Sequence, residues 1–184
     1  MTDPGATSAG GRRGGFTLLD GAAMIVGAAV ASVHFSGVVP GRLTGLGWAF
    51  VWGAFAGVAV TAAGPALFVA RRFVRRAAGY PRVGDATWAV LGLPWLFTAL
   101  LRAPKGPTAP PGELYSTALT MGIAATSVVA LAVAWRRWVS ISKAEAESIA
   151  ATPWTNRLGL VLAVAWPLQW GYGLLLLEDS GGIW

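Results

Sequence analysis

Long stretches without a charged residue are the feature that most constrains how this chain can fold. Five such windows hold 21 residues between Asp20 and Arg42, 28 between Arg42 and Arg71, 16 between Asp85 and Arg102, 22 between Glu113 and Arg136, and 20 between Arg157 and Glu178. A helix needs about 20 apolar residues to cross a hydrocarbon core of about 30 Å. Four windows reach that length. The third reaches it if Arg102 extends its apolar stem and places its charge at the interface.

The windows predict an all-α polytopic membrane protein with about five transmembrane helices. None of them alternates with period two, so a transmembrane β-barrel is disfavoured. The expected spans are about 18–39, 44–70, 87–101, 114–135 and 153–177. Pro65, Pro94 and Pro167 should bend the second, third and fifth spans. We expect residues 1–15 to form a flexible cytoplasmic tail and residues 16–184 to form a single helical membrane domain.

The composition excludes several kinds of site. Only 12% of residues are charged, about half of what a soluble domain carries, and the mean hydropathy is +0.58. This argues against both a disordered chain and a soluble enzyme. The absence of Cys excludes disulfides, thiolate metal sites and cysteine nucleophiles, and the single His34 excludes a site with two imidazoles from one chain. We therefore predict no catalytic centre, no metal site and no required cofactor.

Basic residues predict the orientation of the spans. Eleven Lys and Arg residues lie before the first span, between the second and third spans, and between the fourth and fifth spans. The connections on the opposite side carry three, which are Arg42, Arg102 and Lys105. Short loops rich in Lys and Arg stay in the cytoplasm. The amino terminus should therefore lie inside and Trp184 outside, in a bacterial inner membrane. The orientation of the spans already explains the high number of arginines, so we do not expect nucleic-acid binding.

One cytoplasmic connection is especially basic. Its sequence RRFVRR places Arg71, Arg72, Arg75 and Arg76 just after the second span. Guanidinium groups at this level are expected to contact anionic lipid headgroups, and a plain orientation signal is the alternative. Farther along the chain, the sequence of residues 140–151 predicts a short cytoplasmic helix. Asp20, at the start of the first span, is a candidate partner for an arginine of a cytoplasmic connection.

Small residues recur at four-residue spacing in the first two spans. Gly27 lies between Ala23 and Ala31 in the first span, and Gly53 and Gly57 form a G-x-x-x-G in the second. Such stripes let two helix backbones approach closely in lipid, where apolar burial supplies no driving force. We expect these glycines to pack the two spans against each other. An oligomeric interface with a membrane-protein partner or a second copy is the alternative.

The aromatic residues and the histidine supply the candidate ligand sites. Six of the ten tryptophans fall near predicted span ends and suit an interfacial belt: Trp48, Trp88, Trp135, Trp138, Trp154 and Trp184. Trp52, Trp95, Trp166 and Trp170 should lie deeper. Trp166 and Trp170 flank Pro167, and this segment is a candidate wall of a pigment, quinone or lipid pocket. His34 is a candidate axial ligand, with a hydrogen bond to a neighbouring helix as the alternative.

The segment Gly15-Phe16-Thr17-Leu18-Leu19-Asp20 resembles the start of prepilins, in which a basic stretch and a glycine precede F-T-L-x-E. That resemblance implies cleavage between Gly15 and Phe16. Asp20 stands where prepilins have Glu, and further spans follow where they have a soluble domain. The segment is also similar to the start of bacterial polytopic membrane proteins that have no assigned activity.

Three functional hypotheses are consistent with these features of the sequence. The leading one is a non-enzymatic accessory or scaffold subunit of a membrane complex, because small-residue stripes and Trp-rich faces suit helix–helix contacts. The second is a channel or facilitative transporter for a small solute, built around the proline bends. The third is a pigment- or quinone-binding subunit that uses His34 or the Trp166–Trp170 segment.

Overall fold

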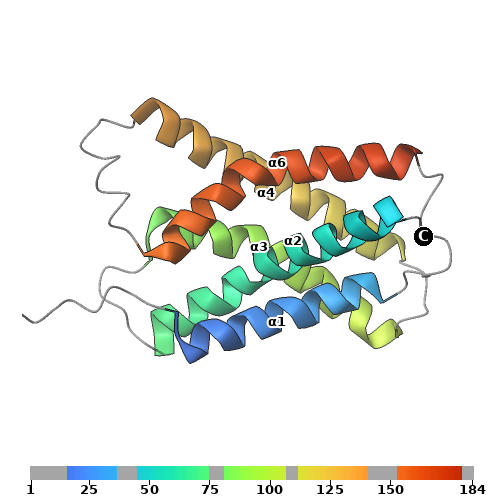
Figure 1. The fold of residues 1–184 in the computed structure, drawn as a ribbon, viewed down its shortest axis with the longest axis horizontal. Coiled ribbons are helices and arrows are strands. Elements are labelled where there is room, and N and C mark those ends of the chain that lie inside the picture. The colour runs from blue at the N-terminus through green and yellow to red at the C-terminus, as the bar shows by residue number, and fades with distance from the viewer. Residues whose placement is uncertain (1–15, 37–44, 75–80, 107–111, 141–152, 180–184) are drawn as a thin grey trace, which may run out of the picture.

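The protein is an antiparallel bundle of long helices, seen in a computed structural model that describes residues 16–36, 45–74, 81–106, 112–140 and 153–179. The elements are α1 (Leu18–Phe35), α2 (Gly45–Val69) with the π-turn η2 (Ala70–Val74), α3 (Val83–Arg102) with the 3-10 turn η3 (Ala103–Lys105), α4 (Glu113–Ser140) and α6 (Trp154–Asp179). The described residues contain no strand. Helices α1, α3 and α6 run in one direction, and α2 and α4 run in the other (Figure 1).

Four of the predicted spans are confirmed as helices long and apolar enough to cross a membrane. They are Leu18–Phe35, Gly47–Val74, Val83–Lys105 and Glu113–Arg136. The fifth predicted span coincides with α6, a helix of 26 residues. Pro65, Pro94 and Pro167 all lie inside continuous helices, and α6 changes direction along its length (Figure 1). Ser140, the first residue of the helix predicted at 140–151, ends α4, whereas residues 141–151 and the predicted tail at 1–15 lie outside the described residues.

Helix α3 corrects the prediction of a short third span. It begins at Val83 instead of residue 87, because Asp85 lies inside its first turn. The Asp85 Oδ2 atom accepts a hydrogen bond from the Arg82 backbone N–H at 3.2 Å, which satisfies an amide at the helix start. A charge that marked the end of an apolar window is therefore part of the helix. The resulting helical segment needs no extension by Arg102 to cross the bilayer.

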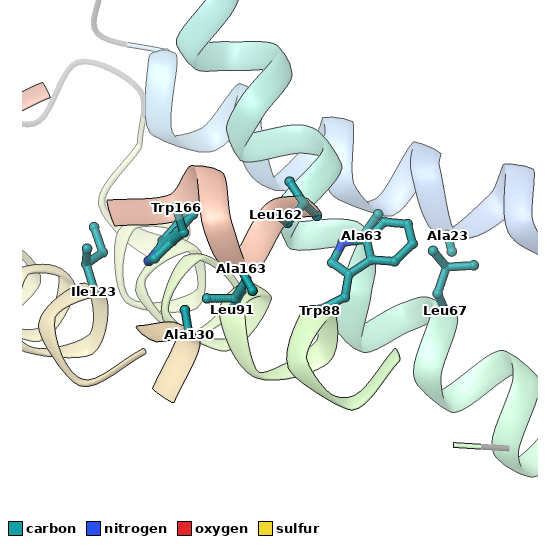
Figure 2. Close-up of a cluster of buried hydrophobic side chains, with 10 residues drawn as sticks. All are labelled: Ala23, Ala63, Leu67, Trp88, Leu91, Ile123, Ala130, Leu162, Ala163 and Trp166. Carbon is teal, nitrogen blue, oxygen red and sulfur yellow. The ribbon is translucent and has the colours of Figure 1, made fainter. Parts of the chain in front are cut away.

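Helix α3 is also the centre of the bundle, since it packs against α1, α2, α4 and α6. A core cluster of buried side chains from all five helices surrounds it (Figure 2): Ala23, Ala63, Leu67, Trp88, Leu91, Ile123, Ala130, Leu162, Ala163 and Trp166. Trp88 was predicted to lie in an interfacial belt, but it is only 1% exposed. Its Nε1–H donates to the Val60 carbonyl at 2.8 Å, which joins α3 to α2 and satisfies the buried indole.

Helix α4 is the most peripheral of the four confirmed spans. Only 17% of its apolar window is buried inside the bundle, against 44% for α3. Its outward side chains include Leu114, Met121, Val128 and Trp135. A helix that is apolar on its outward face suits contact with lipid or with another membrane helix.

Candidate functional site

Two clusters of polar side chains lie at opposite ends of the bundle and form its candidate functional sites. The Asp20 cluster consists of Asp20, Arg71, Trp154 and Thr155. The His34 cluster consists of His34, Trp95, Arg102 and Tyr115. Asp20 and His34 lie near the two ends of α1, so the clusters are separated by most of the length of that helix.

The Asp20 cluster is a bidentate ion pair that joins three elements. Arg71 donates from Nε to Asp20 Oδ1 at 3.0 Å and from Nη2 to Oδ2 at 2.8 Å, and its Nη1 donates to Thr155 Oγ1 at 3.2 Å. The guanidinium carbon lies 5.5 Å from the centre of the Trp154 ring. Asp20 is fully buried, and it also accepts from the Thr17 backbone N–H at 3.0 Å. The pair therefore fixes η2 against α1 and α6.

The Arg71 side chain does not lie where the basic segment predicted it. It is 8% exposed and turned into the bundle, whereas the prediction placed it against lipid headgroups. Arg71 follows the buried Ala63 and Leu67 at four-residue spacing, so it continues the inward face of α2. Arg72 follows with an exposed side chain, and Arg75 and Arg76 lie outside the described residues. The partner proposed for Asp20 from the sequence, an arginine near the cytoplasmic loop, is Arg71.

The His34 cluster uses both nitrogens of the imidazole. Nε2 lies 3.0 Å from the Trp95 carbonyl oxygen, and Nδ1 lies 2.6 Å from the Tyr115 hydroxyl. A carbonyl only accepts, so in the neutral ring Nε2 donates to it and Nδ1 accepts from the Tyr115 O–H. His34 thereby joins α1 to α3 and α4. An axial haem or pigment ligand needs one free ring nitrogen, so ligation would require breaking one of these bonds.

Arg102 belongs to the same cluster and corrects a second expectation. The sequence predicted that its charge would reach the interface, but the residue is 6% exposed. The guanidinium carbon lies 5.5 Å from the centre of the Tyr115 ring, a cation–π contact. Its Nε atom is buried without a hydrogen-bond partner. None of the carboxylates in the described ranges forms an ion pair with Arg102.

An aromatic chain leads from the His34 cluster into the core. The ring centroids of His34 and Trp95 lie 5.2 Å apart and those of Trp95 and Trp166 lie 5.9 Å apart, and both pairs are edge to face. The Nε1–H groups of Trp95 and Trp166 are buried without a partner. The structure thus links His34 and Trp166, two predicted site residues, through Trp95. The side chain of Trp170 lies outside the described residues.

The predicted packing glycines separate into different roles. A Cβ on Gly27 would collide with the Ala59 carbonyl oxygen, so Gly27 lies at the α1–α2 contact. Gly53 instead faces open space, and its own face of α2 also exposes Ala49, Trp52 and Ala56. Gly57 is half-buried, and its carbonyl accepts from Thr61 Oγ1 at 2.7 Å. At Gly53, the small-residue stripe of α2 therefore faces outward and does not contact α1.

The sequence patterns did not indicate the close crossing of α3 and α6. Gly84 of α3 and Gly159 of α6 meet so tightly that a Cβ on either would collide with the opposite backbone. The Gly84 N–H donates to Asn156 Oδ1 at 2.8 Å, an unusual bond between a helix-start amide and a side chain of another helix. The two glycines are 75 positions apart in the sequence and belong to no short motif. The neighbouring Asn156, a polar residue at the start of an apolar span, was the signal available.

Within the described residues, no three His, Asp or Glu side chains gather closely enough to hold a metal ion. The arrangement joins helices through charge-assisted hydrogen bonds at the Asp20 end and through the neutral hydrogen bonds of His34 at the other end. It also leaves a buried cation, Arg102, with an unused donor. Comparisons with models of protein families, with curated proteins and with solved structures found no match to this chain.

Proposed function

We propose that the protein is a five-span bacterial inner-membrane protein that acts as a non-enzymatic accessory or scaffold subunit. The amino terminus lies in the cytoplasm, and α6 is the fifth span. The distribution of Lys and Arg supports this orientation, because it puts 11 of 14 basic residues on the cytoplasmic side. The alternation of helix direction in the bundle also suits five successive crossings (Figure 1).

The exposed small-residue face of α2 is the observation that carries the accessory role. Polar side chains inside the bundle join its own helices, whereas Gly53 and its neighbours Ala49 and Ala56 face outward with no covering atoms near Gly53. The exposed Trp52 lies on the same face. In lipid, a small-residue face with an adjacent large side chain lets a second helix approach closely and pack. We infer that the partner is a transmembrane helix of another subunit or of a second copy.

Purification from native membranes in mild detergent tests this proposal. We expect a stoichiometric partner, either another membrane protein or a second copy, to elute with the chain. Gly53→Leu should remove most of it, because the added side chain prevents close helix approach. Gly45→Leu is the matched control, since Gly45 also lies on α2 with no atom within 4 Å of a Cβ.

A monomeric chain that elutes alone, with Gly53→Leu unchanged from wild type, would contradict the accessory role. Solute flux in liposomes that contain only this chain would then favour the channel hypothesis.

The pigment or quinone hypothesis is favoured by one specific observation. The unpartnered Nε1–H groups of Trp95 and Trp166 are buried donors that a carbonyl oxygen would satisfy. Visible absorbance that accompanies the purified chain and is lost in Trp166→Phe would support this second candidate in place of the first.

A further inference from the structure

We propose that the His34 cluster, together with Lys105, binds the phosphate group of an anionic lipid headgroup. This inference rests on the membrane placement proposed above but not on the accessory role. It is carried by the burial of Arg102 and by the position of Lys105 beside it in the chain. Arg71 and Arg72, two of the arginines predicted to meet headgroups on the cytoplasmic side, lie at the other end of the bundle.

Arg102 provides the first contact. A buried guanidinium is costly unless an anion compensates it, and the described part of the chain supplies no carboxylate in ion-pair contact. The Nε atom is enclosed and unused. A planar guanidinium presents its donors in a fork that matches two phosphate oxygens. Because Nε is enclosed, the anion would bind at the Nη atoms, which are not among the buried unpartnered atoms, and would compensate the charge of the guanidinium.

The cluster holds the guanidinium in place. The Tyr115 ring stacks against Arg102, and the Tyr115 hydroxyl is itself fixed by His34, whose other nitrogen bonds to the Trp95 carbonyl. The three residues that position Arg102 thus come from α1, α3 and α4. A fixed cation loses little conformational entropy when it binds, which favours recognition of a ligand over nonspecific attraction.

Lys105 provides the second contact. It is exposed on η3, one turn beyond Arg102, and a Cβ on Gly112 would lie 2.8 Å from its Nζ atom. The ammonium group therefore lies at the start of α4, where the first backbone amides have no partner within the helix and the helix dipole is positive. The other charged group in the first turn of α4 is the exposed Glu113.

The surroundings favour a lipid over free phosphate. Leu114 is exposed at the start of α4, beside the Gly112 that Lys105 approaches, and Met121 and Val128 follow it at seven-residue spacing on the same outward face of that helix. Apolar side chains below a basic end suit acyl chains below a phosphate. In the proposed orientation, this end of the bundle lies in the outer leaflet.

Native mass spectrometry of the detergent-solubilised chain tests the site, with phosphatidylglycerol and phosphatidylcholine titrated separately. We expect preferential binding of phosphatidylglycerol. Lys105→Gln should weaken it about fivefold, the effect of one basic residue near a lipid surface. Arg102→Gln should weaken it more, because it removes the fork of donors. Arg157→Gln, an exposed arginine at the opposite end, is the matched control and should bind as wild type does.

Equal phosphatidylglycerol binding by wild type, Lys105→Gln and Arg102→Gln would overturn the proposal. Lys105 is exposed, so its variant reports on binding even if Arg102→Gln unfolds. A titration with inorganic phosphate separates the two sources of the ligand: saturable phosphate binding without a phosphatidylglycerol preference would overturn the lipid assignment. Failure of the chain to enter nanodiscs of either lipid would instead contradict the membrane placement.

Discussion

Individual polar residues hold this bundle together at positions where apolar side chains would be the simpler choice. Asp20 is fully buried, and Arg71 binds it with two hydrogen bonds, a geometry that gives direction as well as attraction. The sequence made Asp20 a candidate partner for an arginine of a predicted cytoplasmic connection, and several arginines lie in those connections. Arg71 is the partner because it follows the buried Leu67 by four residues on the inward face of α2, and the hydropathy pattern of an apolar helix does not show which face is inward.

Removal of one partner from this pair should destabilise the protein strongly. Asp20→Asn leaves the Arg71 guanidinium buried without a counter-charge, which should lower the free energy of unfolding by about 3–5 kcal/mol. Thermal or denaturant unfolding in detergent measures the loss. Glu113→Gln, at an exposed carboxylate, is the control and should change stability by less than about 0.5 kcal/mol.

The double variant Asp20→Asn with Arg71→Gln should lose less than the sum of the two single variants, because no unpaired charge remains. Strictly additive losses would show that the two side chains are not coupled.

At the scale of elements, the helices approach one another through glycines that have different surroundings. Gly27 and Gly84 lie against the backbone of a neighbouring helix, whereas Gly53 faces open space. The four-residue spacing predicted both Gly27 and Gly53 as packing residues, because spacing places residues on one helix stripe without indicating which neighbour the stripe meets. It did not indicate Gly84 and Gly159, which are far apart in the sequence and meet only when α3 and α6 cross.

Alanine substitutions should separate these two kinds of glycine. Gly84→Ala forces a methyl group into the Asn156 carbonyl of α6, so the helices must separate, at a cost of about 1–3 kcal/mol. Gly53→Ala meets no atom and replaces glycine with a better helix former, so stability should stay equal or rise by up to about 1 kcal/mol. Parallel unfolding measurements compare the two. Equal effects would contradict the close α3–α6 crossing.

At the scale of the whole molecule, the placement in the bilayer can be tested residue by residue, because the chain has no cysteine of its own. Ala103→Cys and Pro81→Cys introduce single thiols at exposed positions near opposite ends of α3. With the amino terminus inside, a membrane-impermeant maleimide should label Ala103→Cys in intact bacterial cells. It should label Pro81→Cys only after the cells are permeabilised. The reverse pattern would invert the proposed orientation.

The amino-acid sequence by itself predicted a helical chain and located its apolar segments, and four of the predicted spans, in α1 to α4, are helices long and apolar enough to cross a membrane. These properties follow from hydropathy and length, which are local. The tertiary structure decided that Arg71 and Arg102 are buried, that α3 includes Asp85, and that Gly84 meets Gly159. In lipid, residues that face a neighbouring helix and residues that face acyl chains are both apolar, so the pattern along one helix does not identify its partner.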